Sequence, residues 1–294
     1  MKYIPVLFTC LILFSCKGNK NHTGIKNVHN DLAKAHLFGR VKSVCKVTYA
    51  ANVISGNIVK GEQFGIDSEK YNPAGFMTEQ ATYQQGVLLT REIISKYDAH
   101  NNVLEEHSYF NYNLGQTDSI VDKDYTFECT TNPEGKILKK ITMLNGKLVE
   151  TQENTLDNDG NIIEDKKYSP GDTLVEDAKF KYNIRGNIIE IIRANADGKV
   201  TSKIKSTYDT AGNMLEDLRY KSDTTWDTKD LMTYDGTGNE LEHTCQYYWG
   251  NGNYIFDWKY TYPSFDREGN WVKNSFYEKG QLISVKERTI EYYK

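Results

Sequence analysis

The stretch TYDTAGN at residues 207–213 is the clearest copy of a short phrase whose close variants recur along the chain. Similar phrases begin at Tyr97 (YDAHNN), Tyr182 (YNIRGN) and Tyr234 (YDGTGN). Aligned on the glycine of the phrase, most copies fall about 26 residues apart, at Gly75, Asn101, Gly135, Gly160, Gly186, Gly212, Gly238 and Gly269. Recurrence at a nearly constant period indicates a repeat architecture in which each unit packs on its neighbours.

The phrase itself predicts a tight turn. Asp209 is suited to cap a type I turn through its side chain, and Gly212 to close the turn in the left-handed conformation. The same structural role is predicted for the matching residues of other copies, Asp98, Gly186, Asp235 and Gly238. Asn101 stands where other copies have glycine, and asparagine tolerates that conformation better than most residues.

Between these turns the sequence alternates as a β-strand does. Residues 200–208 place Ile204 and Tyr208 on one face and Lys203 and Lys205 on the other. A second class of turn falls near the middle of most periods, at Gln85-Gly86, Asn145-Gly146, Pro170-Gly171, Asp197-Gly198 and Lys279-Gly280. Asn-Gly and Asp-Gly favour two-residue hairpin loops. The sequence therefore predicts an all-β fold, a repetitive antiparallel β-hairpin sheet of about 16 strands.

The turn also predicts which strand residues meet. If Asp209 pairs with Asn213, Tyr208 lies opposite Met214, a cross-strand contact worth on the order of 0.2 to 1 kcal/mol. The corresponding pairs are Tyr71 with Met77, Tyr97 with Val103 and Tyr182 with Ile188, whereas Tyr234 faces Glu240.

An acidic residue stands four positions after the turn position in six copies, as Glu79, Glu105, Glu164, Glu190, Glu216 and Glu242. Lys139 and Lys273 replace it in the other two. A row of carboxylates could bind cations or supply a catalytic acid. A repeated position serves structure more readily than a single active site, so we expect each glutamate to pair with a nearby lysine or arginine.

The N-terminus has the pattern of an export signal. Lys2 precedes a short apolar run at 4–14, and Cys16 follows it as in the bacterial lipobox. We expect lipidation at Cys16, which anchors the protein to a membrane; the alternative is an ordinary signal peptide with a chance cysteine. Lys17 after the cysteine favours the outer membrane of a Gram-negative cell envelope. The expected domains are a lipoprotein signal peptide (1–15), a lipid-anchored tether with a short helix capped by Asn30 (16–36) and the β-hairpin repeat domain (37–294).

Composition excludes several classes of site. The net charge of -4 becomes -5 without residues 1–15, and no basic stripe is present, which argues against nucleic acid as a partner. Three histidines lie seven residues apart in or beside the tether, at His22, His29 and His36, but a flexible segment does not hold ligands, so we expect no metal. Cys45, Cys129 and Cys245 can form at most one disulfide. No pattern indicates a cofactor.

The candidate ligand site lies in the C-terminal part, which holds all four tryptophans. The segment QYYWGNGNY at 246–254 falls in a stretched repeat. We expect aromatic residues on a glycine-rich loop to stack on sugar or peptide, with Tyr247, Tyr248, Trp249, Tyr254 and Trp258 as the binding residues. The alternative is that these rings cap the open end of the sheet, where the last hairpin lacks a neighbour.

With its period and hairpins, the chain resembles the YD-repeat (RHS-repeat) family, whose motif G-x(3–9)-Y-D-x-x-G is matched at Tyr208-Asp209 with Gly212 and at Tyr234-Asp235 with Gly238. Looser matches are Tyr182-Asn183 with Gly186 and Tyr71-Asn72 with Gly75. The resemblance covers roughly residues 60–294 and implies a β-spiral or an open curved sheet. It implies no established activity, and the toxin domain and cleavage motif of the large members are not recognisable here.

Three functions remain open. The first is a non-catalytic, envelope-anchored interaction module for a protein or glycan. The second is a hydrolase acting on envelope polymers, but His100, His107 and His243 have no Cys or acidic partner at a known ligand spacing, and no nucleophile motif is present. The third is a β-barrel through the outer membrane, which the lysine pairs 179/181 and 203/205 on the face opposite the core oppose.

Overall fold

The computed structural model describes residues 30–111, 120–220, 226–249 and 252–294. Across these residues the chain forms a short helix, α1 (Asp31–Lys34), and eighteen strands of one antiparallel sheet. The strands are β1 (Val41–Ile54), β2 (Asn57–Tyr71), β3 (Met77–Gln84), β4 (Val87–Tyr97), β5 (Val103–Asn111), β6 (Ile120–Thr131), β7 (Ile137–Leu144), β8 (Lys147–Leu156), β9 (Ile162–Ser169), β10 (Thr173–Tyr182), β11 (Ile188–Ala194), β12 (Val200–Tyr208), β13 (Met214–Tyr220), β14 (Trp226–Tyr234), β15 (Glu240–Trp249), β16 (Gly252–Phe265), β17 (Trp271–Glu278) and β18 (Gln281–Tyr292). The prediction of an all-β antiparallel hairpin sheet is confirmed.

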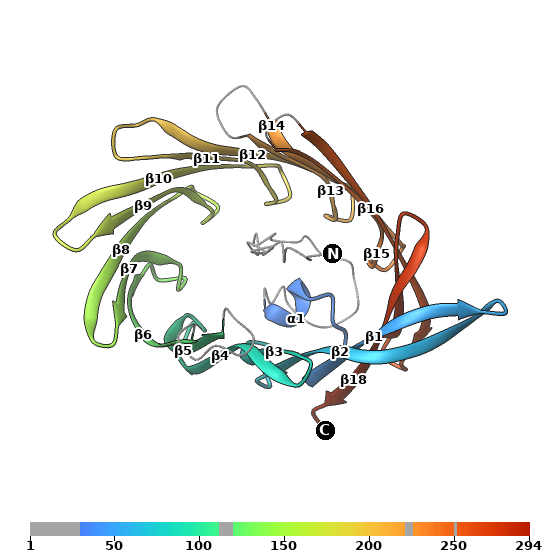
Figure 1. Ribbon diagram of the computed structural model, residues 1–294. Helices are drawn as coiled ribbons and strands as arrows, with labels where there is room; N and C mark the ends of the chain where they lie inside the picture. The colour runs from blue at the N-terminus through green and yellow to red at the C-terminus, as the bar shows by residue number, and fades with distance from the viewer. Residues whose placement is uncertain (1–29, 112–119, 221–225, 250–251) are drawn as a thin grey trace.

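The sheet closes into a barrel because β1 pairs with both β2 and β18 (Figure 1). Val44 lies opposite Glu69 on one side and Ile290 on the other. Tyr293 joins the seam, since its hydroxyl donates a hydrogen bond to the carbonyl oxygen of Tyr71 at 2.6 Å. The expected open or spiral sheet of about 16 strands is wrong both in closure and in strand number.

The physical reason for both errors is clear. Eight repeat turns separate nine hairpins, and the hairpin of β1 and β2 precedes the first repeat turn. Closure depends on contacts between distant segments, such as the hydrogen bond from Ser43 to Glu291, 248 residues apart. A local sequence pattern does not report a pairing over that distance.

The repeat turns all lie at one end of the barrel, the repeat-turn end, and have the predicted geometry. The carboxylate of Asp209 accepts hydrogen bonds from the backbone N–H groups of Ala211 (2.7 Å) and Asn213 (2.8 Å). Gly212 has a φ of 86° and donates its N–H to the carbonyl oxygen of Asp209. The backbone pattern repeats at 72–76, 98–102, 132–136, 157–161, 183–187, 235–239 and 266–270. All five predicted tyrosine partners are confirmed by the register.

The opposite end carries the hairpin loops. Asn145 and Gly146 both have positive φ, 49° and 74°, as a two-residue type I′ loop requires, so that prediction is confirmed. The same prediction for Asp197-Gly198 is wrong. Asn195 there accepts hydrogen bonds from the N–H groups of Asp197 and Lys199, which builds a five-residue turn like that of the repeat phrase.

The inner face of the barrel is identified by α1, which lies inside the ring of strands (Figure 1). Leu32 and Leu37, at and just after this helix, pack with Val44 and Tyr71 in one buried cluster. Val44 therefore faces inward. Side chains alternate along a strand, and directly paired residues share a face, so the register carries this assignment around the barrel.

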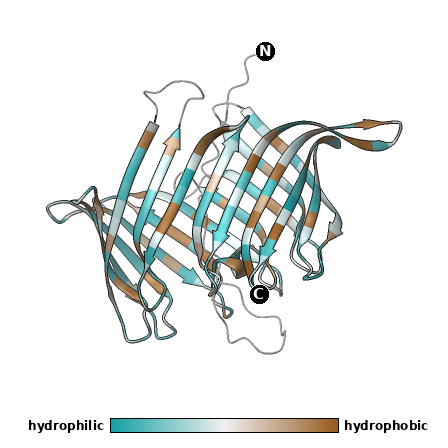
Figure 2. Cartoon of the chain, turned by 90° about the horizontal axis from the view of Figure 1, so that it is seen from below, coloured by the Kyte–Doolittle hydropathy of each residue, from teal (hydrophilic) through white to brown (hydrophobic). Residues whose placement is uncertain are grey.

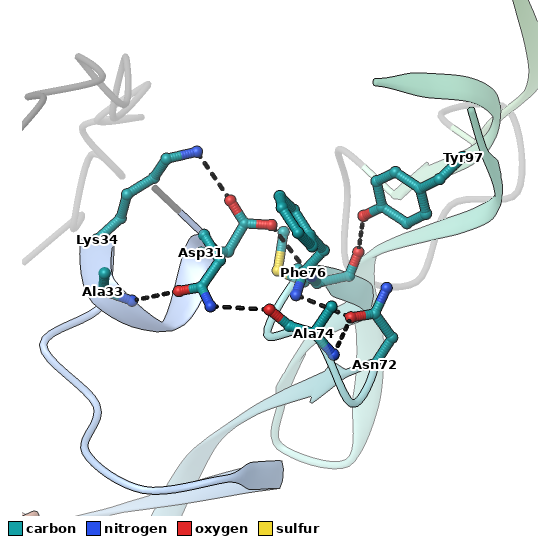
Figure 3. Close-up of polar contacts among 9 residues, drawn as sticks. Asp31, Ala33, Lys34, Asn72, Ala74, Phe76 and Tyr97 are labelled. Atoms are coloured by element: carbon teal, nitrogen blue, oxygen red, sulfur yellow. Dashed lines mark hydrogen bonds and ion pairs between the residues drawn. The ribbon is translucent and has the colours of Figure 1, made fainter. Parts of the chain in front are cut away.

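The N-terminal segment, residues 30–38, contacts turns at the repeat-turn end of the barrel, and Figure 3 shows its contacts with the first of them. Asn30 caps α1 by accepting from the N–H of Ala33, as predicted, and its amide donates to the carbonyl oxygen of Ala74 at 2.8 Å. The N–H of Met77 donates to the carboxylate of Asp31 at 2.8 Å. Farther along, the amide of Asn270 both accepts from and donates to the backbone of Phe38. Residues 30–38 thus connect the first repeat turn to the last.

The outer face carries ion pairs around the barrel. Each repeated glutamate contacts a basic side chain: Glu79 with Lys70 and Arg91, Glu105 with Lys96, Glu164 with Lys166 and Lys179, Glu190 with Lys181 and Lys203, Glu216 with Lys229, and Glu242 with Lys259. We call these pairs the ion-pair belt. The expectation that the glutamates are paired is confirmed. Figure 2 shows hydrophilic stretches interrupting the hydrophobic ones along the strands.

Candidate binding surface inside the barrel

Strand β16 presents five aromatic side chains at every second position, Tyr254, Phe256, Trp258, Tyr260 and Tyr262, which we call the aromatic row. Because side chains alternate along a strand, all five face the same way. Register places that face inside the barrel: Tyr260 pairs with Phe276, Phe276 with Ser284, and Ser284 with Ala50, which shares the face of Val44 on β1.

Ring contacts extend the row onto its neighbours. Phe256 stacks on Trp258 at 5.9 Å between ring centroids, and Tyr260 lies 5.4 Å from Phe276 of β17. At the repeat-turn end, Tyr262 lies 5.7 Å from Trp271. Eight residue steps at about 3.4 Å give the row a length of roughly 27 Å. From Phe256 to Tyr262 its members are half-buried, so part of each ring stays accessible.

The number of strands predicts an open interior next to the accessible surface of the row. Barrels of about eight strands are filled by their own side chains, whereas 16 to 18 strands leave an aqueous interior. An extended molecule in this interior would meet a continuous aromatic surface along one wall. Aromatic faces pack well on the apolar faces of sugar rings and on peptide groups.

A polar network lies beside the row, on the inner faces of β12 to β15. Asp217, which is buried, accepts hydrogen bonds from the hydroxyl of Ser206 (2.7 Å) and from Nε of Arg219 (2.9 Å). Nη2 of Arg219 lies 4.0 Å from the carboxylate of Asp230. Asp230 also contacts Nε2 of His243 at 2.9 Å.

His243 connects the network to the aromatic row. Its ring meets Trp258 edge-on, with 4.9 Å between centroids, and its Nδ1 lies 3.5 Å from the carboxylate of Glu240. Burial by itself lowers the pKa of His243, but the hydrogen bonds to Asp230 and Glu240 outweigh it and raise the pKa to about 9. The imidazole is therefore protonated at neutral pH, with both nitrogens engaged.

Cys245 completes a Cys, His and Asp group whose chemistry is not nucleophilic. The thiol is buried, and burial together with the neighbouring Asp230 raises its pKa to about 12. A thiol is reactive as the thiolate, which is scarce at such a pKa, and a protonated His243 cannot act as its base. The group is a hydrogen-bonded part of the inner wall next to Trp258.

The expectation that the binding residues lie on a glycine-rich loop is wrong, because they lie on strands. β15 and β16 form a hairpin through these residues. Tyr247 contacts Tyr254 at 5.6 Å between centroids, and Trp258 lies on the same inner face. Tyr248 alternates away from them and contacts Trp226 at 4.8 Å. The side chain of Trp249 lies outside the described residues.

The alternative that these rings cap an open end of the sheet is also wrong, because the last hairpin has a neighbour: β18 pairs with β1. Of the aromatic row, Tyr254 and Trp258 are among the predicted binding residues, whereas Phe256, Tyr260 and Tyr262 are not. The signal that finds them is the period-two run of aromatic residues from 254 to 262. The acidic partners of His243, Asp230 and Glu240, are also not predicted, because the contacts depend on strand register and on the conformation near a turn.

Among the described residues, no group of three or more His, Cys, Asp or Glu side chains could hold a metal ion. The described cysteines, Cys45, Cys129 and Cys245, are free. His22, His29 and the lipidation site Cys16 lie outside the described part of the chain. No helix in that part is long and apolar enough to cross a bilayer.

No protein-family model matches the chain, and no curated protein matches it. Among solved structures, it is similar to a porin-like protein from Bacteroides uniformis ATCC 8492, with a TM-score of 0.43, 11% identity, and coverage of 85% of this chain and 98% of that one. It is also similar to TcdB2-TccC3-TEV, with a TM-score of 0.30, 14% identity, and coverage of 81% of this chain and 15% of that one. The likeness to the YD-repeat family therefore stays a resemblance.

Proposed function

We propose that this protein is a non-catalytic, envelope-anchored binding module that holds an extended glycan along the aromatic row inside its barrel. The observation that carries the proposal is the row itself, five inward-facing aromatic side chains in succession on β16. A linear surface of this kind favours a chain-like ligand over a compact one. Beside the row, the side chain of Arg219 is 42% exposed, and its guanidinium can donate hydrogen bonds to sugar hydroxyls.

A glycan is favoured over a protein partner by position. A folded protein would need an exposed surface patch, whereas the aromatic row lies on the inside of a closed barrel. A sugar chain needs only the width of the interior and offers a ring face to stack at each unit.

The ion-pair belt supports placing the barrel in water and opposes the outer-membrane alternative. In lipid, exposed Lys or Arg at the bilayer midplane costs about 2–4 kcal/mol each. Lys179, Lys181 and Lys203 are among the belt residues on the outer face. Anchoring would then come from lipid on Cys16, with the barrel held beside the membrane.

The hydrolase alternative lacks a comparable observation. The buried Cys, His and Asp group has a protonated thiol and a cationic imidazole in the folded protein. Both states are the wrong ones for nucleophilic attack at neutral pH.

A glycan array tests the proposal. The chain with its first sixteen residues removed should bind array oligosaccharides, and Trp258→Ala should reduce that binding at least tenfold. Tyr248→Ala is the matched control, because it removes an aromatic ring from the other face of the same hairpin. Equal loss in both variants, or unchanged binding after Trp258→Ala, contradicts the proposed site.

A further inference from the structure

Three basic side chains meet on the inner face where β1 and β18 join. Lys46 lies opposite Arg288, and Thr48 lies opposite Lys286, so the three cations occupy neighbouring positions of two paired strands. We call them the cation cluster. They share the face of Val44, which points into the barrel.

The aromatic row leads directly to this cluster. Tyr262, the last member of the row, contacts Trp271, and the guanidinium carbon of Arg288 lies 3.4 Å from the centre of the Trp271 ring. An arginine stacked on an aromatic ring in this way can still use the N–H groups in the plane of its guanidinium to bind anions. A ligand that follows the row to the repeat-turn end would arrive at the cations.

The acids nearby neutralise the cluster only in part. Glu69 accepts hydrogen bonds from Lys46 and from the hydroxyl of Tyr71 (2.6 Å). Asp67 accepts from the hydroxyl of Thr82 at 3.0 Å. Lys286 makes no ion pair with any acid in the described part of the chain, and Nε of Arg288 is buried there without a hydrogen-bond partner.

An unpaired cation beside two others is costly unless something else supplies the charge. Burial, and then the like charges of Lys46 and Arg288, lower the pKa of Lys286 against the opposing effect of Asp67. A half-buried lysine in this environment destabilises the folded protein. An anion that enters with the ligand would offset that cost by pairing with the lysine.

We propose that the glycan is acidic, and that a carboxylate or sulfate on it binds Lys286 and Arg288 at the end of the aromatic row. This inference rests on the proposed function and adds the chemical class of the ligand. The row supplies stacking and the cluster supplies charge recognition, as in other sites that combine a planar surface with a guanidinium.

The test uses an array printed with oligouronates and their methyl esters in matched pairs, which differ only in charge. Wild type should prefer the acids, and the preference should weaken as salt rises. Lys286→Gln should reduce affinity for the acids about tenfold and leave the esters unaffected. Lys286→Arg keeps the positive charge and should retain the affinity for the acids. Lys203→Gln, on the outer face, is the control.

The outcomes separate the two proposals. Binding that depends on Trp258 but shows no preference for the acids, or is unchanged by Lys286→Gln, overturns the acidic-glycan inference and leaves the proposed function standing. If no oligosaccharide binds in a Trp258-dependent way, both fail. A thermal scan guards against misfolding: we expect Lys286→Gln to unfold at an equal or higher temperature, because it relieves repulsion.

Discussion

The hydroxyl of Tyr208 donates a hydrogen bond to the backbone carbonyl oxygen of Ile188, 2.8 Å away, in β11, the strand that follows the preceding repeat turn. Tyr182 makes the same contact with Ile162 at 2.7 Å, and in each case the partner lies 20 residues earlier. The tyrosine of the repeat phrase therefore secures more than its own strand pair. In these two copies it links the strand before one repeat turn to the strand that follows the preceding repeat turn.

Tyr208→Phe removes only the hydroxyl and should lower the free energy of unfolding by about 1 kcal/mol. Burial raises the pKa of Tyr208 to about 12, so the hydroxyl keeps its proton and donates throughout the neutral range. Urea denaturation measures the change. Tyr248→Phe is the control, and an equal effect there would show that the hydrogen bond from Tyr208 to Ile188 contributes nothing particular.

Gly238→Ala should destabilise the barrel by roughly 1–2 kcal/mol, because the residue has a φ of 91° that an L side chain adopts at a cost. A Cβ there would also come within 2.9 Å of the His36 ring. Gly236 lies in the same turn without a positive φ and with open space around it. Gly236→Ala should change thermal stability little; similar losses in the two variants would contradict this account of the turn.

The stability of the protein should fall as pH rises from about 6.5 to about 9 because of His243. Its folded pKa of about 9 exceeds its value of 6.5 in the unfolded chain, so its stabilising contribution is complete below 6.5 and is lost as pH passes 9. The change should be on the order of 2–3 kcal/mol. Denaturation at several pH values measures it, and His243→Gln should flatten this part of the profile. An unchanged profile would show that Asp230 and Glu240 do not hold the charged ring.

Cys16→Ala should abolish incorporation of radiolabelled palmitate and release the protein from the membrane fraction. The reason is that Cys16 is the residue that the lipobox pattern marks for lipidation. Cys10→Ala, within the signal, is the control and should leave labelling intact. Absence of label in wild type would remove the lipoprotein prediction.

What the sequence predicts well is local. Asp209 and Gly212 specify their turn through their own hydrogen bonds and φ, and the turn in turn sets Tyr208 against Met214. The pairing of Glu190 with Lys181 follows from the same register. These features need only the residues within one or two hairpins.

What it predicts poorly depends on distance or on counting. Closure requires β1 to meet β18, and Asp230 reaches His243 only once β14 and β15 are aligned. The aromatic row is a different case. Its alternation is visible in residues 254–262, but the face of the sheet on which the rings lie follows only from the register of the closed barrel.

Binding inside the barrel can be tested by comparing two adjacent residues of β16 that face opposite ways, Tyr254 inside the barrel and Ile255 outside. A benzophenone amino acid is placed at each position in turn, and photo-crosslinking to an array-selected glycan is measured by mass spectrometry. We expect crosslinks from position 254 and none above background from 255. Equal crosslinking at both positions, or crosslinking from 255 alone, would contradict binding inside the barrel.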